Sequence, residues 1–278
     1  MKTATSCKST RKYHGVLLYS TSDEWGPIEV VESATERSLH FGTAAKQSAY
    51  FFNNPQALAL NYTQSMLATL LFLPEPQRVL HIGLGGGSLL RFLHHHYPQL
   101  QQEVVELRPA VYRVAKRFFA CPEAAEITLH LDPVERFCFL HGRHLQHRFD
   151  LILVDAFDAD GLSSELNDPH LMRQFHSFLS PSGVLGINLW SNRSSAVNDL
   201  IAVIKQQFAG DLLRLDVPDK GNQVVIAGQR LSFNGCEERA EYLQRRIALP
   251  FPDMVERLLR LNFQANLERA VAGNATPF

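Results

Sequence analysis

The chain has 278 residues, 45% of them hydrophobic, and a formal net charge of −1 at neutral pH. This balance gives no electrostatic reason to expect a nucleic-acid or acidic-membrane partner. No apolar run approaches the roughly 18 residues of a transmembrane helix, and no apolar core follows the basic residues of 1–11, as a cleaved targeting peptide would require. The scattered cysteines form no CxxC pair, so we expect reduced thiols in a cytoplasmic protein.

Short runs rich in β-branched and aromatic residues open the chain and are separated by turn formers. They cover residues 14–20, 28–33, 38–41 and 49–52, and they predict a small antiparallel β unit. Apolar residues then recur at helical spacing over 57–72, until Pro74 and Pro76 end the predicted helix. We therefore expect an N-terminal β unit with a linking helix over 1–74, and a larger domain over 75–278.

A glycine-rich turn follows the first predicted strand of the larger domain. Four glycines come directly after the apolar run 79–82, namely Gly83, Gly85, Gly86 and Gly87. They allow a tight turn and a close approach to a ligand, and the helix predicted over 88–97 aims its free amides at the same place. Glu106 closes the next strand, where one carboxylate can accept hydrogen bonds from both vicinal hydroxyls of a ribose. This combination predicts a nucleoside cofactor.

Strands and helices alternate as far as residue 190. The strands are predicted over 79–83, 102–106, 127–131, 150–155 and 183–189, with a hairpin over 212–217 and 223–227 and helices from Cys236 onward. This alternation predicts an α/β fold with a doubly wound, mostly parallel sheet. Ligands in such sheets bind over the carboxyl ends of the strands, and successive ends carry Gly83, Glu106, Asp132 and Asp155.

The segment DLILVDAFDAD, residues 150–160, is the second informative stretch. Its strand predicts that Asp155 emerges at the sheet edge and that Asp158 lies in the loop beyond. Paired carboxylates there can hold an ammonium group and remove its proton, which an amine with a pKa of about 10 must lose before it attacks. The alternative for Asp158 is a helix cap, and we take Asp160 as structural.

A metal site and a nicotinamide cofactor are two other interpretations that the sequence supports less well. His94, His95 and His96 are consecutive on a predicted helix, so their side chains fan out by about 100° each and do not converge on one ion; we expect no metal. A nicotinamide cofactor would fit Gly83 and Gly85, but it requires neither Asp132 nor the paired acids.

From about residue 28 to 228 the chain resembles the polyamine aminopropyltransferases, the spermidine synthase family, which share the Rossmann-like fold of class I methyltransferases. GLGGGS (83–88) stands where the family has GGGDGG, and Glu106 and Asp132 match its ribose and adenine acids. DAFD (155–158) matches its DSSDP-type loop, and NYTQSM around Tyr62 is similar to its Tyr-His-Glu or Tyr-Gln-Glu segment.

The resemblance implies transfer of an aminopropyl group from decarboxylated S-adenosylmethionine to a polyamine, with methylthioadenosine as product. It implies Asp155 as the base and Asp158 as the residue that holds the amine. Gly83, Gly85, Gly87, Glu106 and Asp132 would bind the cofactor, and Tyr62 and Gln64 the substrate. It also implies a homodimer.

The chain departs from the family pattern at positions that, in the family, surround the amine groups of cofactor and substrate. Gly86 replaces the Asp of GGGDGG, Thr63 and Gln64 follow Tyr62, and no Tyr-Pro segment precedes Gly221. Because an acid at position 86 would repel the carboxylate of S-adenosylmethionine, Gly86 favours binding of the intact molecule. Two alternatives therefore stay open. One is a methyltransferase that releases S-adenosylhomocysteine, and the other is a nucleoside-binding protein without catalysis.

Overall fold

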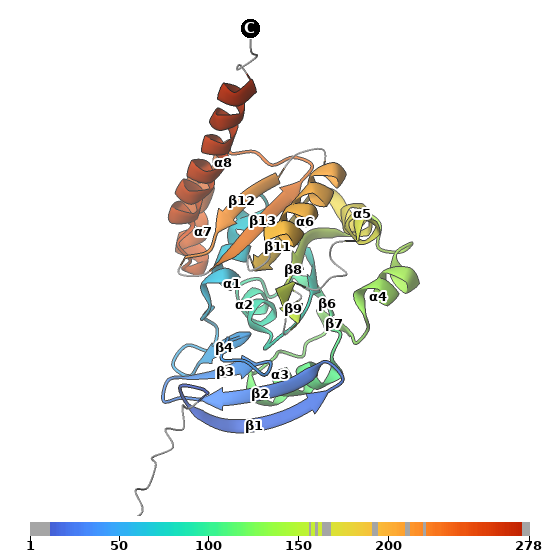
Figure 1. The fold of residues 1–278 in the computed structure, drawn as a ribbon, viewed down its shortest axis with the longest axis vertical. Coiled ribbons are helices and arrows are strands. Elements are labelled where there is room, and N and C mark those ends of the chain that lie inside the picture. The colour runs from blue at the N-terminus through green and yellow to red at the C-terminus, as the bar shows by residue number, and fades with distance from the viewer. Residues whose placement is uncertain are drawn as a thin grey trace, which may run out of the picture.

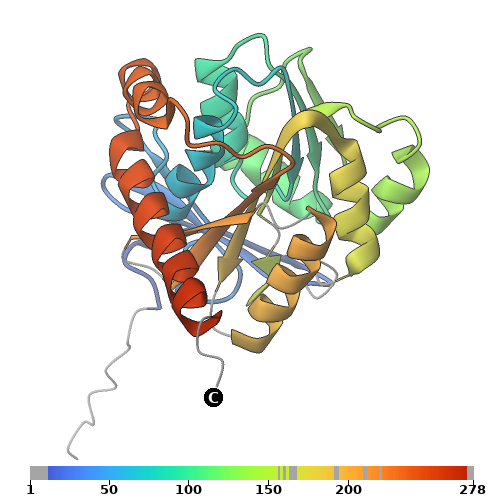
Figure 2. The same ribbon diagram turned by 90° about the horizontal axis from the view of Figure 1, so that it is seen from above.

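The computed structural model describes residues 12–155, 157–158, 161–162, 168–190, 194–208, 212–218 and 221–273. Within them a four-stranded antiparallel sheet lies beside a seven-stranded, mostly parallel sheet (Figure 1). Helices cover both faces of the larger sheet, as the view from above shows (Figure 2). The α/β class, the Rossmann-like sheet and the N-terminal β unit are as the sequence predicts.

The N-terminal sheet consists of β1 (Val16–Asp23), β2 (Gly26–Glu32), β3 (Glu36–His40) and β4 (Ser48–Phe51), in that spatial order. Each pair of neighbours is antiparallel. The buried side chains of Ile28, Val30 and Leu39 pack with Val111 of α3 (Pro109–Phe118) and with Phe119. The small sheet is therefore attached to the larger one through α3.

The helix predicted over 57–72 is shorter than expected and changes its winding. Leu60 has an extended backbone, so α1 covers only Asn61–Met66, and a 3₁₀ helix, η1, continues over Leu67–Leu71. The Thr69 hydroxyl donates to the carbonyl oxygen of Met66 at 2.9 Å, a local bond that competes with α-helical pairing. Apolar spacing therefore identified the buried face but did not distinguish these two windings.

The large sheet contains β5 (Arg78–Ile82), β6 (Gln101–Val105), β7 (Ile127–His130), β8 (Phe149–Val154), β11 (Leu179–Trp190), β12 (Leu212–Asp216) and β13 (Asn222–Gly228). Their spatial order is β12-β13-β11-β8-β5-β6-β7. Only β13 runs antiparallel, to both β11 and β12, which confirms the predicted hairpin. The carboxyl ends of β5 to β8 therefore meet at one edge, and the N-terminal sheet lies against that edge, because the Gly86 amide donates to the Ser48 hydroxyl of β4.

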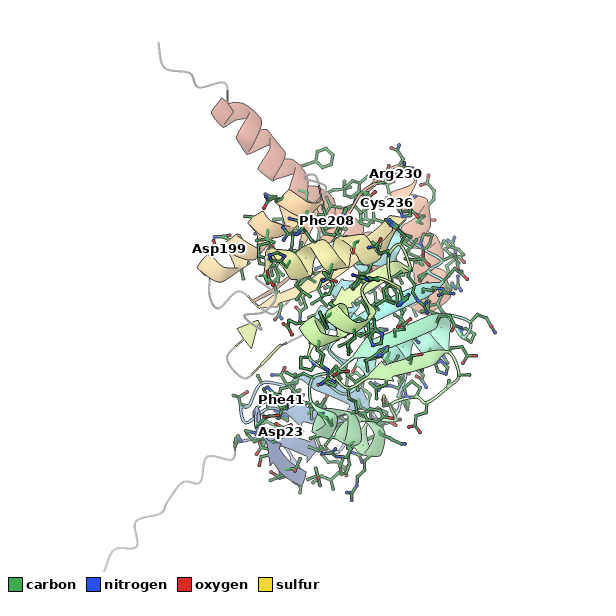
Figure 3. The ribbon with its side chains drawn as sticks, turned by 90° about the vertical axis from the view of Figure 1, so that its right-hand side faces the viewer. Asp23, Phe41, Asp199, Phe208, Arg230 and Cys236 are labelled. Atoms are coloured by element: carbon green, nitrogen blue, oxygen red, sulfur yellow. The ribbon has the colours of Figure 1, made fainter. Side chains whose placement is uncertain are left out.

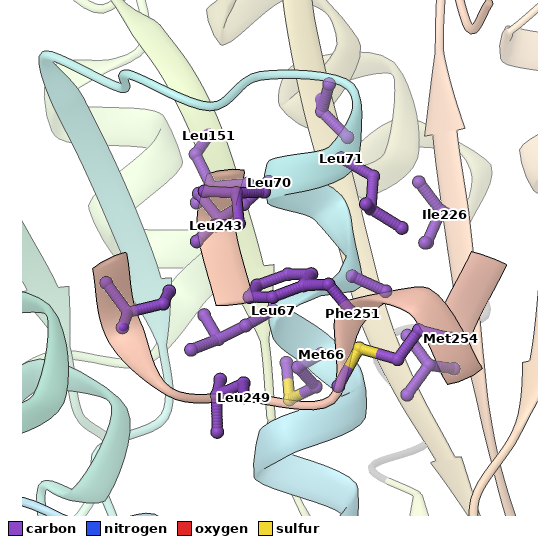
Figure 4. Close-up of a cluster of buried hydrophobic side chains, with 14 of the residues drawn as sticks. Met66, Leu67, Leu70, Leu71, Leu151, Ile226, Leu243, Leu249, Phe251 and Met254 are labelled. Carbon is purple, nitrogen blue, oxygen red and sulfur yellow. The ribbon is translucent and has the colours of Figure 1, made fainter. Parts of the chain in front are cut away.

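Two hydrophobic cores lie on opposite faces of the large sheet. One face packs α2 (Ser88–His96), α7 (Cys236–Ile247) and α8 (Phe251–Gly273), and the other packs α4 (Val134–His141), α5 (Pro169–Phe178) and α6 (Ser194–Gln207). Figure 4 shows how α1 and η1 contribute Met66, Leu67 and Leu70 to the first core, next to Phe251. The segment expected to link two domains is thus part of this core, and the division at residue 74 stays a prediction. No helix in the described ranges is long and apolar enough to cross a membrane.

Gly186 lets η1 approach the middle of β11, and this close contact predicts a stability effect. A Cβ added there would lie 2.7 Å from Cγ2 of Thr69. We expect Gly186→Ala to lower the free energy of unfolding by about 1–3 kcal/mol, the usual cost of overpacking. Thr69→Ser removes Cγ2 but keeps the hydroxyl, so it should recover part of the loss in the double variant. Urea denaturation of the four proteins measures this coupling, and strictly additive losses would contradict it.

Candidate active site

A cavity of about 380 Å³ lies between the carboxyl edge of the large sheet and the N-terminal sheet. Its size falls within the range of about 300–1,000 Å³ typical of ligand pockets. The large sheet and the loops after its strands contribute Ile82, Gly83, Leu84, Gly85, Val105, Glu106, Leu107, Arg108, Asp132, Pro133, Val134, Glu135 and Asp155. The N-terminal region contributes Trp25, Phe41, Gln47 and Tyr62. The acids predicted at successive strand ends therefore share one cavity.

The glycine turn has the backbone geometry that its sequence predicts. Gly83, Gly85 and Gly87 have φ of +93°, +54° and +71°, values that side-chain-bearing residues rarely adopt. Gly83 and Gly85 line the cavity, but Gly87 does not. A Cβ at Gly87 would lie 3.2 Å from Sγ of Cys121, so this glycine faces away from the cavity. Gly87 shapes the turn and precedes α2, and its predicted contact with the cofactor stays a prediction.

Glu106 is placed as predicted, but its carboxylate also has a structural role. Oε2 accepts from the amide of Leu84 at 2.9 Å and Oε1 from the amide of Arg108 at 2.8 Å. The side chain is buried, and burial raises the pKa of Glu106 although these amide bonds oppose the shift. The carboxylate thus fixes the glycine turn, and each oxygen retains acceptor capacity for a ribose hydroxyl.

Asp132 lies on the cavity wall after β7. Its Oδ1 is 3.3 Å from Nε of Arg136, one turn along α4. The first residues of the same segment, Pro133 to Glu135, line the cavity beside it. This wall combines an apolar surface with acceptors, which suits a purine ring.

Asp155 is held by two partners on the cavity floor. Nδ2 of Asn188 donates to its Oδ1 at 2.9 Å, and Oδ1 of Asn188 in turn accepts from Nδ2 of Asn222 at 3.1 Å. The Tyr62 hydroxyl donates to the carbonyl oxygen of Gln47 at 2.9 Å and lies within hydrogen-bonding reach of Asp155. Oδ1 of Asp155 is therefore fixed by an amide donor, and the Tyr62 hydroxyl lies close to the same carboxylate.

Burial sets the protonation behaviour of this group. It raises the pKa of Asp155 to about 6, although Asn188 and Tyr62 stabilise the ionised form. Burial, and then the Asp155 charge, raise the pKa of Tyr62 well above its ordinary value, so the phenol stays neutral. His81 lines a small adjoining cavity with Asp155 and Tyr62, and burial lowers its pKa to about 4. Asp155 is consequently a carboxylate at neutral pH that accepts a proton more readily than an exposed aspartate.

The structure describes the side chain of Gln64, but only the backbone of Asp158. Nε2 of Gln64 donates to the carbonyl oxygen of Leu58 at 2.8 Å, and Gln64 does not line the cavity, so its predicted substrate contact stays a prediction. The backbone of Asp158 belongs to β9 (Phe157–Asp158), which pairs with β10 (Gly161–Leu162). The side chain of Asp158 and all of Asp160 lie outside the described residues, so the role of Asp158 stays a prediction.

The structure gives Gly86 a packing role, whereas the sequence suggested a role in cofactor selection. A Cβ at this position would lie 2.8 Å from Cβ of Ser48 and 3.2 Å from Cδ1 of Phe119. Gly86 does not line the cavity. Its missing side chain therefore makes room for β4 in this chain, and it does not by itself predict which cofactor binds.

Several residues of the site were not predicted from the sequence. Trp25, Phe41, Gln47 and Arg108 come from turns or loops whose position depends on tertiary packing. Asn188 is buried within β11, where a polar residue among apolar neighbours was the available signal. Within the part of the chain that the structure describes, no three His, Cys, Asp or Glu side chains are grouped to hold a metal ion.

Comparisons with known proteins place the chain in a family and relate its fold to solved structures. Residues 61–206 match the model of the spermine/spermidine synthase domain. The polyamine aminopropyltransferase of Chromobacterium violaceum is 31% identical over 241 residues, 85% of this chain and 91% of that protein. A probable spermidine synthase from Corynebacterium glutamicum has a similar structure, with a TM-score of 0.69 at 18% identity over 82% of this chain and 86% of that one. Human methyltransferase-like protein 13, solved with SAH, gives a TM-score of 0.62 at 23% identity over 68% and 92% of the two chains.

The fold is therefore one that this chain shares with solved structures of a methyltransferase-like protein and of a probable spermidine synthase. The chain belongs to the spermine/spermidine synthase family. It is a polyamine aminopropyltransferase-like transferase.

The geometry at Gly86 gives a prediction opposite to the one from sequence. We expect Gly86→Ala and Gly86→Asp to destabilise the protein to a similar extent, by about 1–3 kcal/mol, because the Cβ itself meets Ser48 and Phe119. The ratio of affinities for decarboxylated and intact S-adenosylmethionine should be the same in both variants. Thermal unfolding and competitive titration measure the two effects. A roughly tenfold change of that ratio in Gly86→Asp alone would mean that the acid does reach the cofactor.

Proposed function

We propose that this protein transfers an aminopropyl group from decarboxylated S-adenosylmethionine to an amine of a polyamine and releases methylthioadenosine. The observation that carries the proposal is the carboxylate of Asp155, held by Asn188 on the floor of a cavity with an acidic wall. The cavity also has acids where a nucleoside would be bound, at Glu106 and Asp132. The family membership of the chain supports the same reaction.

Each residue has a distinct part in the proposed step. Glu106 accepts hydrogen bonds from the ribose hydroxyls, and Asp132 contacts the adenine. Asp155 removes a proton from the ammonium group of the acceptor, which frees a lone pair on nitrogen. A C–N bond then forms as the C–S bond of the sulfonium breaks, and the electron pair of that bond stays on sulfur as a neutral thioether. Tyr62 and Asn188 keep Asp155 oriented toward the acceptor.

The charge of the cavity wall favours the decarboxylated cofactor. Four acids line it: Glu106, Asp132, Glu135 and Asp155. Arg108 is the one Lys or Arg among the lining residues that the structure describes, and its guanidinium is paired with Asp23. A wall of this kind attracts sulfonium and ammonium groups and repels the carboxylate of intact S-adenosylmethionine.

Methyl transfer from intact S-adenosylmethionine is the alternative. The sequence suggests it through the absence of an acid at position 86, although a Cβ at that position would meet Ser48 and Phe119 and Gly86 does not line the cavity. The two reactions differ in their products, since methyl transfer leaves S-adenosylhomocysteine in place of methylthioadenosine.

A product assay distinguishes them. We expect methylthioadenosine and an aminopropylated amine when the protein is incubated with decarboxylated S-adenosylmethionine and a panel of diamines and polyamines.

Asp155→Asn should retain affinity for methylthioadenosine and lower turnover by about 10²–10⁴, the usual contribution of a general base. Asp199→Asn, at an exposed position of α6, is the matched control (Figure 3). Mass spectrometry identifies the products, and a methylated amine formed from intact S-adenosylmethionine would establish the alternative.

The pH dependence follows from the environment of Asp155. Because the base must be ionised, turnover should fall as the pH drops through about 6, the raised pKa of this group. Asn188→Leu removes a donor that stabilises the carboxylate, so the pKa should rise and the acidic limb should move to higher pH. The shift should be about one pH unit or more, since a hydrogen bond to a charged group contributes about 1.5–3 kcal/mol. Asn222→Leu, which only frees the amide oxygen of Asn188, should give a smaller shift, and equal profiles for all three proteins would exclude this role for Asn188.

A further inference from the structure

Trp25 lies on the cavity wall, and the reaction described above makes no use of it. It belongs to the turn between β1 and β2, and its side chain is 40% exposed although it lines the cavity. A large aromatic side chain that is partly exposed at a cavity wall can bury more of its surface when a flat ligand packs against it.

Hydrogen bonds fix the turn that carries Trp25. Oδ1 of Asp23 accepts from the amide of Trp25 at 3.1 Å and from Nη2 of Arg108 at 2.7 Å. Oδ2 accepts from Nε of Arg108 at 3.1 Å, so the guanidinium binds the carboxylate in a bidentate manner. Arg108 also donates to the carbonyl oxygen of Gly26 at 2.8 Å and stacks over the Phe41 ring. The indole therefore occupies a set position with respect to the loop after β6.

The order of the N-terminal sheet indicates which part of a ligand Trp25 faces. β4 lies under the glycine turn, where Ser48 meets Gly86, and it follows Gln47. The β1–β2 turn belongs to the opposite side of that sheet and lies under Arg108, two residues beyond Glu106. Figure 3 shows Asp23 and Phe41 together in this part of the N-terminal sheet. Trp25 is thus associated with the ribose end of the cavity, whereas Tyr62 and Gln47 are associated with Asp155.

We propose that Trp25 is a nucleoside-binding residue whose indole packs against the purine and ribose of the ligand. This inference deepens the proposed function, but it rests only on nucleoside binding and not on group transfer. The N-terminal sheet then forms part of the binding site, and the Asp23–Arg108 pair positions its aromatic contact.

Calorimetry with adenosine and methylthioadenosine tests the contact without any turnover. We expect Trp25→Ala to weaken both ligands by about tenfold or more, the range in which an aromatic side chain stacked on a base contributes. Trp25→Phe should lose less, because it keeps a smaller ring. Glu24→Ala, at the exposed neighbouring position, should bind like the unmodified protein. Equal losses for the two ligands place the indole against the nucleoside, whereas a loss confined to methylthioadenosine would overturn that placement.

Fluorescence gives a second, independent measurement. Methylthioadenosine should change the emission of the unmodified protein, and Trp25→Phe should lack most of that change. If calorimetry shows binding while Trp25→Ala, Glu24→Ala and the unmodified protein have equal affinities, the inference is overturned and the proposed function is not. If methylthioadenosine binds with the expected Trp25 response but no aminopropylated product forms, the proposed function fails and the inference holds.

Discussion

The carboxylate of Glu106 is the interaction on which the rest of the site depends. It joins the amide of Leu84 in the glycine turn to the amide of Arg108 beyond β6, so two neighbouring strand ends are fixed to each other. Arg108 extends the connection to Asp23 in the N-terminal sheet. A buried carboxylate requires such donors, because an unpaired charge in the interior is strongly disfavoured. The same physical requirement therefore builds the wall of the cavity and brings the small sheet to it.

Much of this arrangement could be predicted from sequence because it follows from periodicity. Apolar runs located β5, β6, β7 and β8 to within one residue at each end, although β11 begins at Leu179 and not at the predicted residue 183. The parallel topology then required Glu106, Asp132 and Asp155 to meet at one edge. Glycines at positive φ could be predicted from the tight turn after β5, since residues with a Cβ rarely adopt that backbone conformation. These features depend on local pattern and chain direction alone.

The features that sequence reasoning missed depend on how separate elements pack. Gln64 satisfies a carbonyl group near its own helix, which its position after Tyr62 does not reveal. Gly86 is opposite Ser48, a residue of another sheet, so the reason for a glycine there could not be read from the turn. Trp25 lines the cavity from a turn whose Asp23 binds Arg108, 85 residues further along the chain. A family pattern shows which residue matches a motif position more reliably than it shows where the side chain of that residue points.

Under the proposed function, selection of the decarboxylated cofactor is a property of the whole cavity wall and not of one residue. An aspartate at position 86 would be a single point of repulsion, and the described structure leaves no space for it. The acids that line the cavity produce a negative potential, as an aspartate at position 86 would. Arg108, the one lining Lys or Arg in the described part of the chain, is paired with Asp23. Fields of several charges act over the length of a ligand, and low-dielectric walls focus them. Loss of one acid from the family pattern is then compatible with discrimination against a carboxylate, provided that Arg108 remains bound to Asp23. The Asp23–Arg108 salt bridge would then have two parts in the proposed site, because Asp23 also accepts from the amide of Trp25 and its charge offsets that of the guanidinium.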